Sequence, residues 1–239
     1  MDFRYQGTEL ELFAGAKNWK AYFSSFLRPY IKGHILEAGA GSGNTTPYLL
    51  DEQVISCLCL EPDPSLSGII RDKILTKQLP GQCISFTGKI DELAVDQLFD
   101  TIIYIDVLEH IEAEKEEILK AISHLNPGGC LLILVPAHSW LYSKFDAQIG
   151  HFRRYNRKSL LEVMPVHMLQ RKLFYLDSCS LIMSLIQKVF LKQNLPTEKQ
   201  VMLWDQVFVR ISRLSDWICG RRIGKSLVGI WQKESHVNI

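Results

Sequence analysis

The 239-residue chain has no excess of charge of either sign, because 27 lysines and arginines nearly balance 26 acidic residues. A net charge of +1 gives no electrostatic reason to bind nucleic acid, so we expect no nucleic-acid partner. The chain also lacks internal repeats and low-complexity segments. With 47% hydrophobic and 22% charged residues, its composition is that of an ordinary globular protein with a sizeable core.

Features of targeting and of metal binding are also missing. Residues 1–11 are polar and acidic, unlike a secretory signal peptide, and the apolar stretch at 178–191 is too short and too interrupted to span a bilayer. The six cysteines do not have metal-ligand spacing, and several fall in predicted strands. We interpret them as buried reduced thiols. These features predict a cytoplasmic protein without a bound metal.

A glycine-rich turn is the most informative feature that the chain does have. Residues 37–43 read Glu-Ala-Gly-Ala-Gly-Ser-Gly, between a short apolar run at 34–36 and a segment at 44–50 that can open a helix. Glycine has no Cβ and tolerates positive φ, so a ligand can lie against the backbone. The dinucleotide pattern G-x-G-x-x-G is not met, because Asn44 stands at its last glycine. Glu37 would repel a pyrophosphate and favour a cation.

Two acidic residues follow the next two predicted strands. Glu61 ends the apolar run 54–60, about twenty positions after the turn, which suits a ribose diol. An acid at the start of the helix near Pro64 is the alternative interpretation. Asp91 follows the predicted strand 83–87, either as a ligand contact or as the N-cap of a short helix that buries Leu93 and Val95.

The strands continue in alternation with helices. A fourth predicted strand, 99–105, leads into Asp-Val-Leu-Glu-His at 106–110, and a fifth, 130–136, follows Asn-Pro-Gly-Gly at 126–129. Such alternation predicts a parallel-based sheet covered on both sides, with the ligand beyond the C-terminal ends of the strands. An amphipathic helix over 18–30, whose aromatic face we assign to packing, precedes the first strand.

These motifs together resemble those of the class I S-adenosylmethionine (SAM)-dependent methyltransferases, which carry E-x-G-x-G-x-G, D-V-L-E-H and P-G-G patterns in this order. The resemblance implies an α/β Rossmann-like fold with a mostly parallel seven-stranded sheet, helices on both faces and a helical insertion before the last strand. It also implies SAM as cofactor and S-adenosylhomocysteine as product. The cofactor-binding residues it implies are Glu37, Gly39, Ala40, Gly41, Gly43, Glu61, Pro62, Ile90, Asp91, Asp106 and Val107.

We predict a single domain, 1–239, with a cofactor-binding core at 33–135, an active-site loop at 136–158 and a helical insertion at 177–222. The insertion is apolar, with a second helix that Thr197 and Gln200 can cap. Three interpretations of it remain open: a lid over a hydrophobic acceptor, which we favour, a shallow membrane-surface or dimer contact, and additional core.

The active-site loop is rich in aromatic and basic residues and too long for a simple turn. It resembles the V-P-A-H…G-H-Y-R-R-Y stretch of a group of small bacterial methyltransferases. The resemblance implies that His151 faces the substrate. We predict that five further side chains of the loop bind the substrate or order the loop: Trp140, Tyr142, Arg153, Arg154 and Tyr155. The alternative is that the arginines form surface salt bridges and that His151 is structural.

Methyl transfer to an alcohol or phenol requires a base, and histidine fits this role best. The catalytic candidates are His151 and His110 with Asp106 as a partner, while His138 is weaker. We therefore predict O-methylation of a small, partly hydrophobic or lipid-linked acceptor by a monomer or homodimer. N- or C-methylation and a non-catalytic SAM-binding accessory protein are the alternatives.

Overall fold

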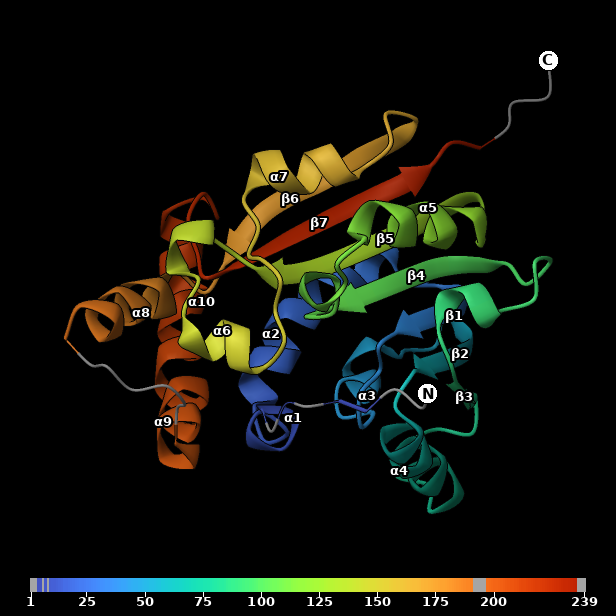
Figure 1. Cartoon of the computed structure of the whole chain (residues 1–239), viewed down its shortest axis with the longest axis horizontal. Helices are drawn as coiled ribbons and strands as arrows, with labels where there is room; N and C mark the ends of the chain where they lie inside the picture. The colour runs from blue at the N-terminus through green and yellow to red at the C-terminus, as the bar shows by residue number, and fades with distance from the viewer. Residues whose placement is uncertain (1–3, 6, 8, 191–196, 236–239) are drawn as a thin grey trace.

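The structure is a computed structural model that describes residues 4–5, 7, 9–190 and 197–235; the start of the predicted second insertion helix, at 194–196, and Leu191 lie outside them. Seven strands form one sheet in the order β3-β2-β1-β4-β5-β7-β6 (Figure 1). They are β1 (Gly33–Ala38), β2 (Val54–Glu61), β3 (Cys83–Thr87), β4 (Phe99–Ile105), β5 (Leu125–Pro136), β6 (Met168–Leu176) and β7 (Ser226–Lys233). Only β7 runs against its neighbours. The predicted mostly parallel seven-stranded sheet is confirmed.

Helices connect the strands along the chain. The α-helices are α1 (Glu9–Leu12), α2 (Lys17–Leu27), α3 (Thr46–Leu49), α4 (Pro64–Leu75), α5 (Glu114–Ser123), α6 (Lys144–Gln148), α7 (Arg157–Val163), α8 (Ser178–Phe190), α9 (Glu198–Leu203) and α10 (Val209–Ile218). Short 3-10 turns are η1 (Arg28–Tyr30), η2 (Ile90–Glu92), η3 (Leu108–His110) and η4 (Ser139–Leu141), and the π-helical turn η5 (Trp204–Phe208) joins α9 to α10.

The side chains of each strand alternate between two cores, one on each face of the sheet. Leu36 and Ile102 point into a core completed by α5 and α7. Their neighbours Ile35 and Ile103 point into a second core completed by α2 and α4. A sheet buried on both faces requires strands that are apolar throughout, which explains the continuous apolar runs of the sequence.

Two local predictions need correction. The helix after the glycine turn is the single turn α3, which begins at Thr46 rather than Asn44. Around Asp91, the N-cap of η2 is Lys89, and Val95 is fully open to solvent while Leu93 is buried. The predicted Thr197–Gln200 capping box is confirmed at α9, and Asn156 caps α7 by accepting a hydrogen bond from the Ser159 backbone N–H.

The insertion between β6 and β7 is tied to the core by two buried carboxylates of its own second helix. Asp205 accepts the backbone N–H groups of Asn18 and Trp19 at the start of α2. Asp216 accepts those of Asp177 and Ser178 at the start of α8. Each acid therefore caps the N-terminus of another helix, where the unpaired N–H groups and the helix dipole favour a negative charge.

A tight backbone contact at the start of β7 gives a stability prediction. A Cβ at Gly224 would overlap the backbone carbonyl of Leu176, which no side-chain rotation can relieve. We expect Gly224→Ala to lower the free energy of unfolding by about 3 kcal/mol, as for severe overpacking. Gly68→Ala, in α4 with open space around the new methyl group, should be neutral or slightly stabilising. Urea unfolding of the two variants checks this, and equal midpoints would contradict it.

Candidate active site

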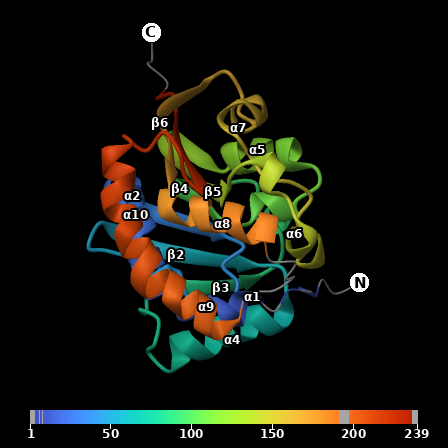
Figure 2. The ribbon, with the colours of Figure 1, turned by 90° about the vertical axis from the view of Figure 1, so that its left-hand side faces the viewer.

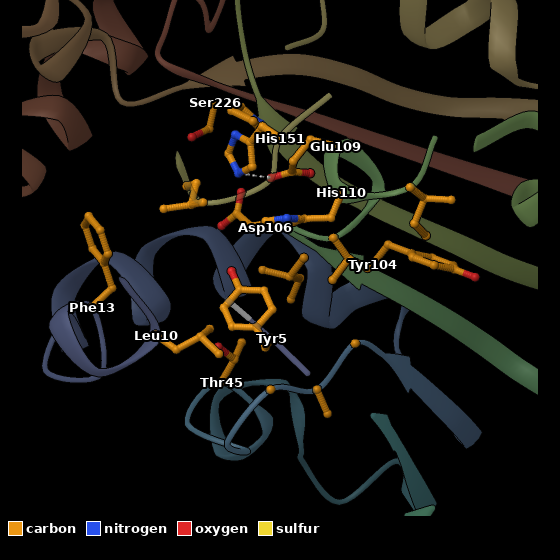
Figure 3. A pocket seen from close by; sticks show the side chains of 18 of the residues that line it. Tyr5, Leu10, Phe13, Thr45, Tyr104, Asp106, Glu109, His110, His151 and Ser226 are labelled. Carbon is orange, nitrogen blue, oxygen red and sulfur yellow. Dashed lines mark ion pairs between the residues drawn. The ribbon is translucent and has the colours of Figure 1, made fainter. Parts of the chain in front are cut away.

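A cavity of about 1450 Å³ opens beyond the C-terminal ends of the parallel strands. The glycine turn and the segment after β4 line one part of it. The helices α6, α8 and α9 lie at the same end of the strands (Figure 1). From the N-terminal segment, Tyr5, Leu10 and Phe13 form another part of the wall (Figure 3). The volume exceeds the roughly 300–1,000 Å³ of a pocket for one small ligand, so it can hold a cofactor and an acceptor together.

The glycine turn brings bare backbone to the cavity. Gly39 has φ of 66°, and a Cβ there would lie 2.6 Å from a methyl group of Val107. Gly41, with φ of 57°, also lines the cavity. Gly43 does not: its φ of 71° lets the chain pack against Ile70 and Leu79. The third glycine of the predicted cofactor set is therefore a packing residue in this structure.

Glu37 is a buried carboxylate at the base of this turn. One of its oxygens accepts a 2.6 Å hydrogen bond from the Thr46 hydroxyl. Burial raises the pKa of Glu37 to about 8, although the bond from Thr46 opposes the shift. Burial disfavours the ionised carboxylate, and one hydrogen bond offsets little of this cost. A positively charged ligand group beside Glu37 would stabilise the ionised form, so the position suits a cation.

Glu61 lies on the adjacent strand end. Its two oxygens accept the backbone N–H groups of Gly41 and Asp63, at 2.8 and 2.9 Å. Burial raises its pKa to about 7 against the effect of these two bonds. The carboxylate keeps lone pairs for further donors, as binding of a ribose diol requires.

Three further residues of the predicted cofactor set, Pro62, Ile90 and Asp91, follow β2 and β3. Ile90 is buried and lines the cavity, and so do Pro62 and Asp91. Asp91 forms an exposed ion pair with Lys120 at 3.2 Å, and this hydrogen bond lowers its pKa. Because exposed ion pairs contribute little to stability, Asp91 can exchange Lys120 for another hydrogen-bond donor at small cost.

A test of Glu37 follows from its raised pKa. We expect Glu37→Gln to weaken SAM binding by about 10- to 100-fold, because a charged hydrogen-bond partner is lost. The wild-type affinity should rise between pH 6 and pH 7 by up to about tenfold, because the proton of Glu37 must leave before the cation binds. Isothermal titration calorimetry at the two pH values checks both expectations. The same pH slope in wild type and variant would contradict the assignment.

Asp106 begins the segment after β4 and faces the centre of the cavity (Figure 3). Its φ of 52° is unusual for a residue other than glycine, and its backbone N–H bonds to the carbonyl of Leu134. Surrounding protein raises the pKa of Asp106 to about 7, while Lys225 and Arg154 oppose this shift. Such strain at a cavity-lining acid is typical of a functional position.

His151 is held by a buried carboxylate from the same loop, Asp146. Its Nδ1 lies 3.0 Å from Oδ1 of Asp146, and Arg154 donates to the same oxygen at 2.7 Å. Burial alone would raise the pKa of Asp146, but the bonds from His151 and Arg154 outweigh it and lower the pKa. An ionised carboxylate on Nδ1 fixes the tautomer in which Nε2 is free to accept a proton.

The opposite ring nitrogen of His151 faces Glu109. The distance between Nε2 and Oε1 of Glu109 is 3.7 Å (Figure 3). Glu109 is fully buried, and among the described residues neither of its carboxylate oxygens has a hydrogen-bond partner. Burial and the nearby Asp106 raise the pKa of Glu109 well above its usual range.

His110 packs edge-on against His151, with ring centroids 4.5 Å apart. Burial, and secondly His151, lowers the pKa of His110 to about 4. It is therefore neutral at physiological pH and a weak base. His138 points elsewhere: its Nε2 lies 2.9 Å from the Gly224 carbonyl, and its ring stacks on Tyr175.

Of the five side chains predicted to bind the substrate, only Arg154 lines the cavity. Trp140 and Tyr142 are 48% and 38% exposed, and the Tyr142 hydroxyl donates to the His151 carbonyl. Arg153 forms an ion pair with Glu114 and donates to the Glu112 carbonyl. Tyr155 is buried, with its hydroxyl bonded to the Leu108 carbonyl. In the structure these four side chains do not line the cavity, and their predicted contact with the substrate stays a prediction.

The sequence reasoning missed several residues of the site. Asp146 is one; its signal was the spacing of Ser143-x-x-Asp146, which forms a capping box at α6. Glu109 belongs to the motif after β4 but received no role. Trp204 comes from the insertion, and Lys225 directly precedes β7. No local pattern in the sequence connects these two residues to the other cavity residues.

Two groups of side chains place possible metal donors together. Donor atoms of Glu109, His110 and His151 all lie within 4.8 Å of one another, and so do the thiols of Cys57, Cys59 and Cys83. The three cysteines are buried in the second core, in keeping with reduced structural thiols. The first group faces the cavity, where either a proton or a cation can balance its carboxylate.

Comparisons with known proteins agree with this geometry. Residues 16–176 match the family described as "Methyltransferase domain". The chain is 27% identical over 115 residues to a ubiquinone biosynthesis O-methyltransferase of Rickettsia conorii; the match covers 48% of this chain and 38% of that protein. The chain thus spans well under half the length of this relative.

Two solved structures share the fold. The N-methyltransferase NodS from Bradyrhizobium japonicum, in complex with S-adenosylhomocysteine, has a TM-score of 0.56 at 13% identity, over 96% of this chain and 93% of that one. A phosphoethanolamine N-methyltransferase of Haemonchus contortus, in complex with SAM, has a TM-score of 0.65 at 13% identity, over 97% of this chain and 59% of that one.

The chain belongs to the methyltransferase domain family. SAM is the cofactor that the sequence motifs imply, and the two structures above hold SAM or its product. The residues present fit this group, because the turn is free of side chains and the buried Glu37 requires a cationic partner. In the described part of the chain, the helices are too short or too polar to cross a membrane.

Proposed function

We propose that this enzyme methylates a hydroxyl oxygen of a small, partly hydrophobic or lipid-linked molecule, with His151 as the general base. The observation that carries the proposal is the Asp146–His151 pair: Asp146 holds Nδ1, and His151, whose Nε2 lies beside Glu109, lines a cavity large enough for two ligands. Oxygen acceptors need a base, whereas a carbon or a neutral amine acceptor can react without one.

The chain's own residues would act mainly by placement. Glu37 and Glu61 would hold the two ends of the cofactor at the strand edge, and Asp106 would lie between cofactor and acceptor. SAM supplies an electrophilic methyl group, which an in-line nucleophile receives with loss of the thioether. His151 would take the hydroxyl proton as the oxygen–methyl bond forms, and Asp146 would stabilise the resulting imidazolium.

The lining of the cavity supports an apolar acceptor. Phe13, Met183, Trp204 and Phe208 contribute apolar surface to the cavity. Three of these residues come from the insertion, which supports its proposed role as a lid over the acceptor. The similarity to the Rickettsia enzyme favours oxygen as the acceptor atom, since that relative is described as an O-methyltransferase.

A matched set of acceptors tests the proposal. Transfer from labelled SAM is measured to an alkylated phenol or catechol and to the amine with the same chain. We expect transfer to the hydroxyl compounds and little to the amine. Transfer to the amine alone would overturn the proposal.

Adding the chelator EDTA tests whether a proton or a metal ion neutralises the buried carboxylate of Glu109. Rates unaffected by EDTA would support a proton at this group. Loss of transfer in EDTA, restored by Mg²⁺ or Zn²⁺ in wild type but not in Glu109→Gln, would replace the general base by a bound cation.

A further inference from the structure

The helix formed by α9, η5 and α10 carries its apolar side chains on the outside. The outermost residues recur at helical spacing: Val207, Ile211, Leu214 and Ile218. They are between 41% and 69% exposed, and Trp217 beside them is 69% exposed. The buried side of the same helix holds Val201, Asp205, Val209, Ser212 and Asp216. A surface helix normally has the reverse arrangement, with its apolar stripe toward the core.

The polar residues on the buried side of this helix form hydrogen bonds with neighbouring helices. Asp205 and Asp216 cap α2 and α8, and the Ser212 hydroxyl donates to Asp177. The fold therefore accounts for the buried side of the helix, but it gives no reason for the outward one. Contiguous exposed apolar surface of this kind marks an interaction site.

The exposed charges beside the stripe are mostly positive. Lys199, Arg210, Arg213 and Arg222 are exposed, whereas Asp205 and Asp216 are buried and Glu198, at the start of α9, is the one exposed acid between residues 198 and 223. The stripe from Leu203 to Ile218 extends about 22 Å along the helix. Figure 2 shows α9 and α10 as one long rod at the edge of the molecule, with α8 beside it.

We propose that the outward face of α9–α10 lies in the surface of an anionic lipid membrane. Apolar side chains including tryptophan, next to arginines and with few exposed acids, are the composition of helices that rest in the membrane interface plane. The helix would lie along the surface without crossing it. A second copy of the chain fits less well, because in a two-fold contact the arginines of α10 would meet each other, and α10 exposes no acid to pair them.

The position of the cavity supports this placement. Leu203 is exposed on the stripe and also lines the cavity, as does Val201 from the same helix. A molecule leaving the lipid surface at this helix would reach the acceptor wall directly. This last step rests on the proposed function, but membrane docking itself does not.

Vesicle sedimentation tests the docking. Wild-type protein should bind vesicles that contain phosphatidylglycerol and bind phosphatidylcholine vesicles more weakly. The double variant Leu214→Gln/Ile218→Gln should lower the partition coefficient at least about tenfold, because two apolar side chains no longer enter the lipid. Arg210→Gln should lower it about fivefold on the anionic vesicles and leave the phosphatidylcholine value unchanged.

Leu75→Gln/Val166→Gln, which changes two apolar residues elsewhere that are even more exposed, is the control and should bind like wild type. Unchanged SAM affinity establishes that each variant is folded. Equal vesicle binding by the Leu214/Ile218 variant and wild type would overturn the proposal. A wild-type dimer in light scattering that Leu214→Gln dissociates would also overturn it. Transfer to a water-soluble acceptor should be unaffected by the Leu214/Ile218 changes, so failure of docking and failure of the proposed function are distinguishable.

Discussion

Replacing His151 with glutamine is expected to lower kcat by about 10²- to 10⁴-fold, the usual contribution of a positioned general base. The side chain stays polar and of similar length, but it has no basic nitrogen to take the proton of the acceptor. SAM affinity should remain within about threefold of wild type, because the carboxylates that we propose to bind the cofactor, Glu37 and Glu61, are on β1 and β2 and not in the loop of His151. Steady-state kinetics with a hydroxyl acceptor and calorimetry with SAM measure the two quantities.

His110→Gln is the matched control for this prediction. His110 touches His151 and lines the same cavity, but its low pKa of about 4 leaves it with little basicity. We expect less than a tenfold loss of kcat. If His110→Gln caused the larger loss and His151→Gln the smaller one, the roles assigned to the two rings would be reversed.

Asp146→Asn is expected to lower both stability and activity. Asp146 is fully buried and accepts hydrogen bonds from His151, Arg154 and Ser143. Its loss leaves the buried Arg154 guanidinium without a counter-charge, which costs about 3 kcal/mol in the free energy of unfolding. The asparagine NH₂ can also donate to Nδ1 and favour the wrong tautomer of His151, so kcat should fall at least about tenfold.

The pH dependence of this stability difference has a definite sign. The pKa of Asp146 is lower in the folded protein than its unfolded value of about 3.9, so its stabilising contribution is complete above that value. The contribution is lost as the pH falls toward the folded pKa. The difference in unfolding free energy between wild type and Asp146→Asn should therefore be constant from pH 8 to pH 5 and shrink below pH 4.

Urea unfolding across this range measures the difference, with Glu162→Gln as control. Glu162 forms only an exposed pair with Lys158, and its loss should change stability little at any pH. If the difference in unfolding free energy between wild type and Asp146→Asn grew on acidification, Asp146 would not be the ionised partner of His151 and Arg154.

The cofactor half of the site was predictable because its signals are local. A strand, a glycine turn and an acid at a fixed distance imply close approach whatever the rest of the chain does, so Glu37, Gly39, Gly41 and Glu61 were placed on one edge correctly. Asp106 was placed with them because it ends the neighbouring strand β4. O-methylation, the base and a cytoplasmic location stay predictions.

The acceptor half was predicted less well because its geometry is non-local. The loop 136–158 has many aromatic and basic residues, and composition alone cannot tell which of them fold inward. Tyr155 became core and Arg153 paired with Glu114, while the unnoticed Asp146 became the partner of His151. Which side chains of the loop fold inward depended on the hydrogen-bond partners that η3 and α5 offer them.

By itself the sequence determined the order of strands and helices, the parallel-based sheet and the edge of the sheet at which the predicted cofactor residues gather, because apolar periodicity and turn chemistry act over a few residues. Only the tertiary structure decided which side of the insertion faces outward. Asp205 and Asp216 turn inward because the starts of α2 and α8 offer them unpaired N–H groups. That requirement comes from helices that are distant in the sequence, 186 residues away for Asp205 and 38 for Asp216, and it leaves the apolar stripe of α10 on the surface.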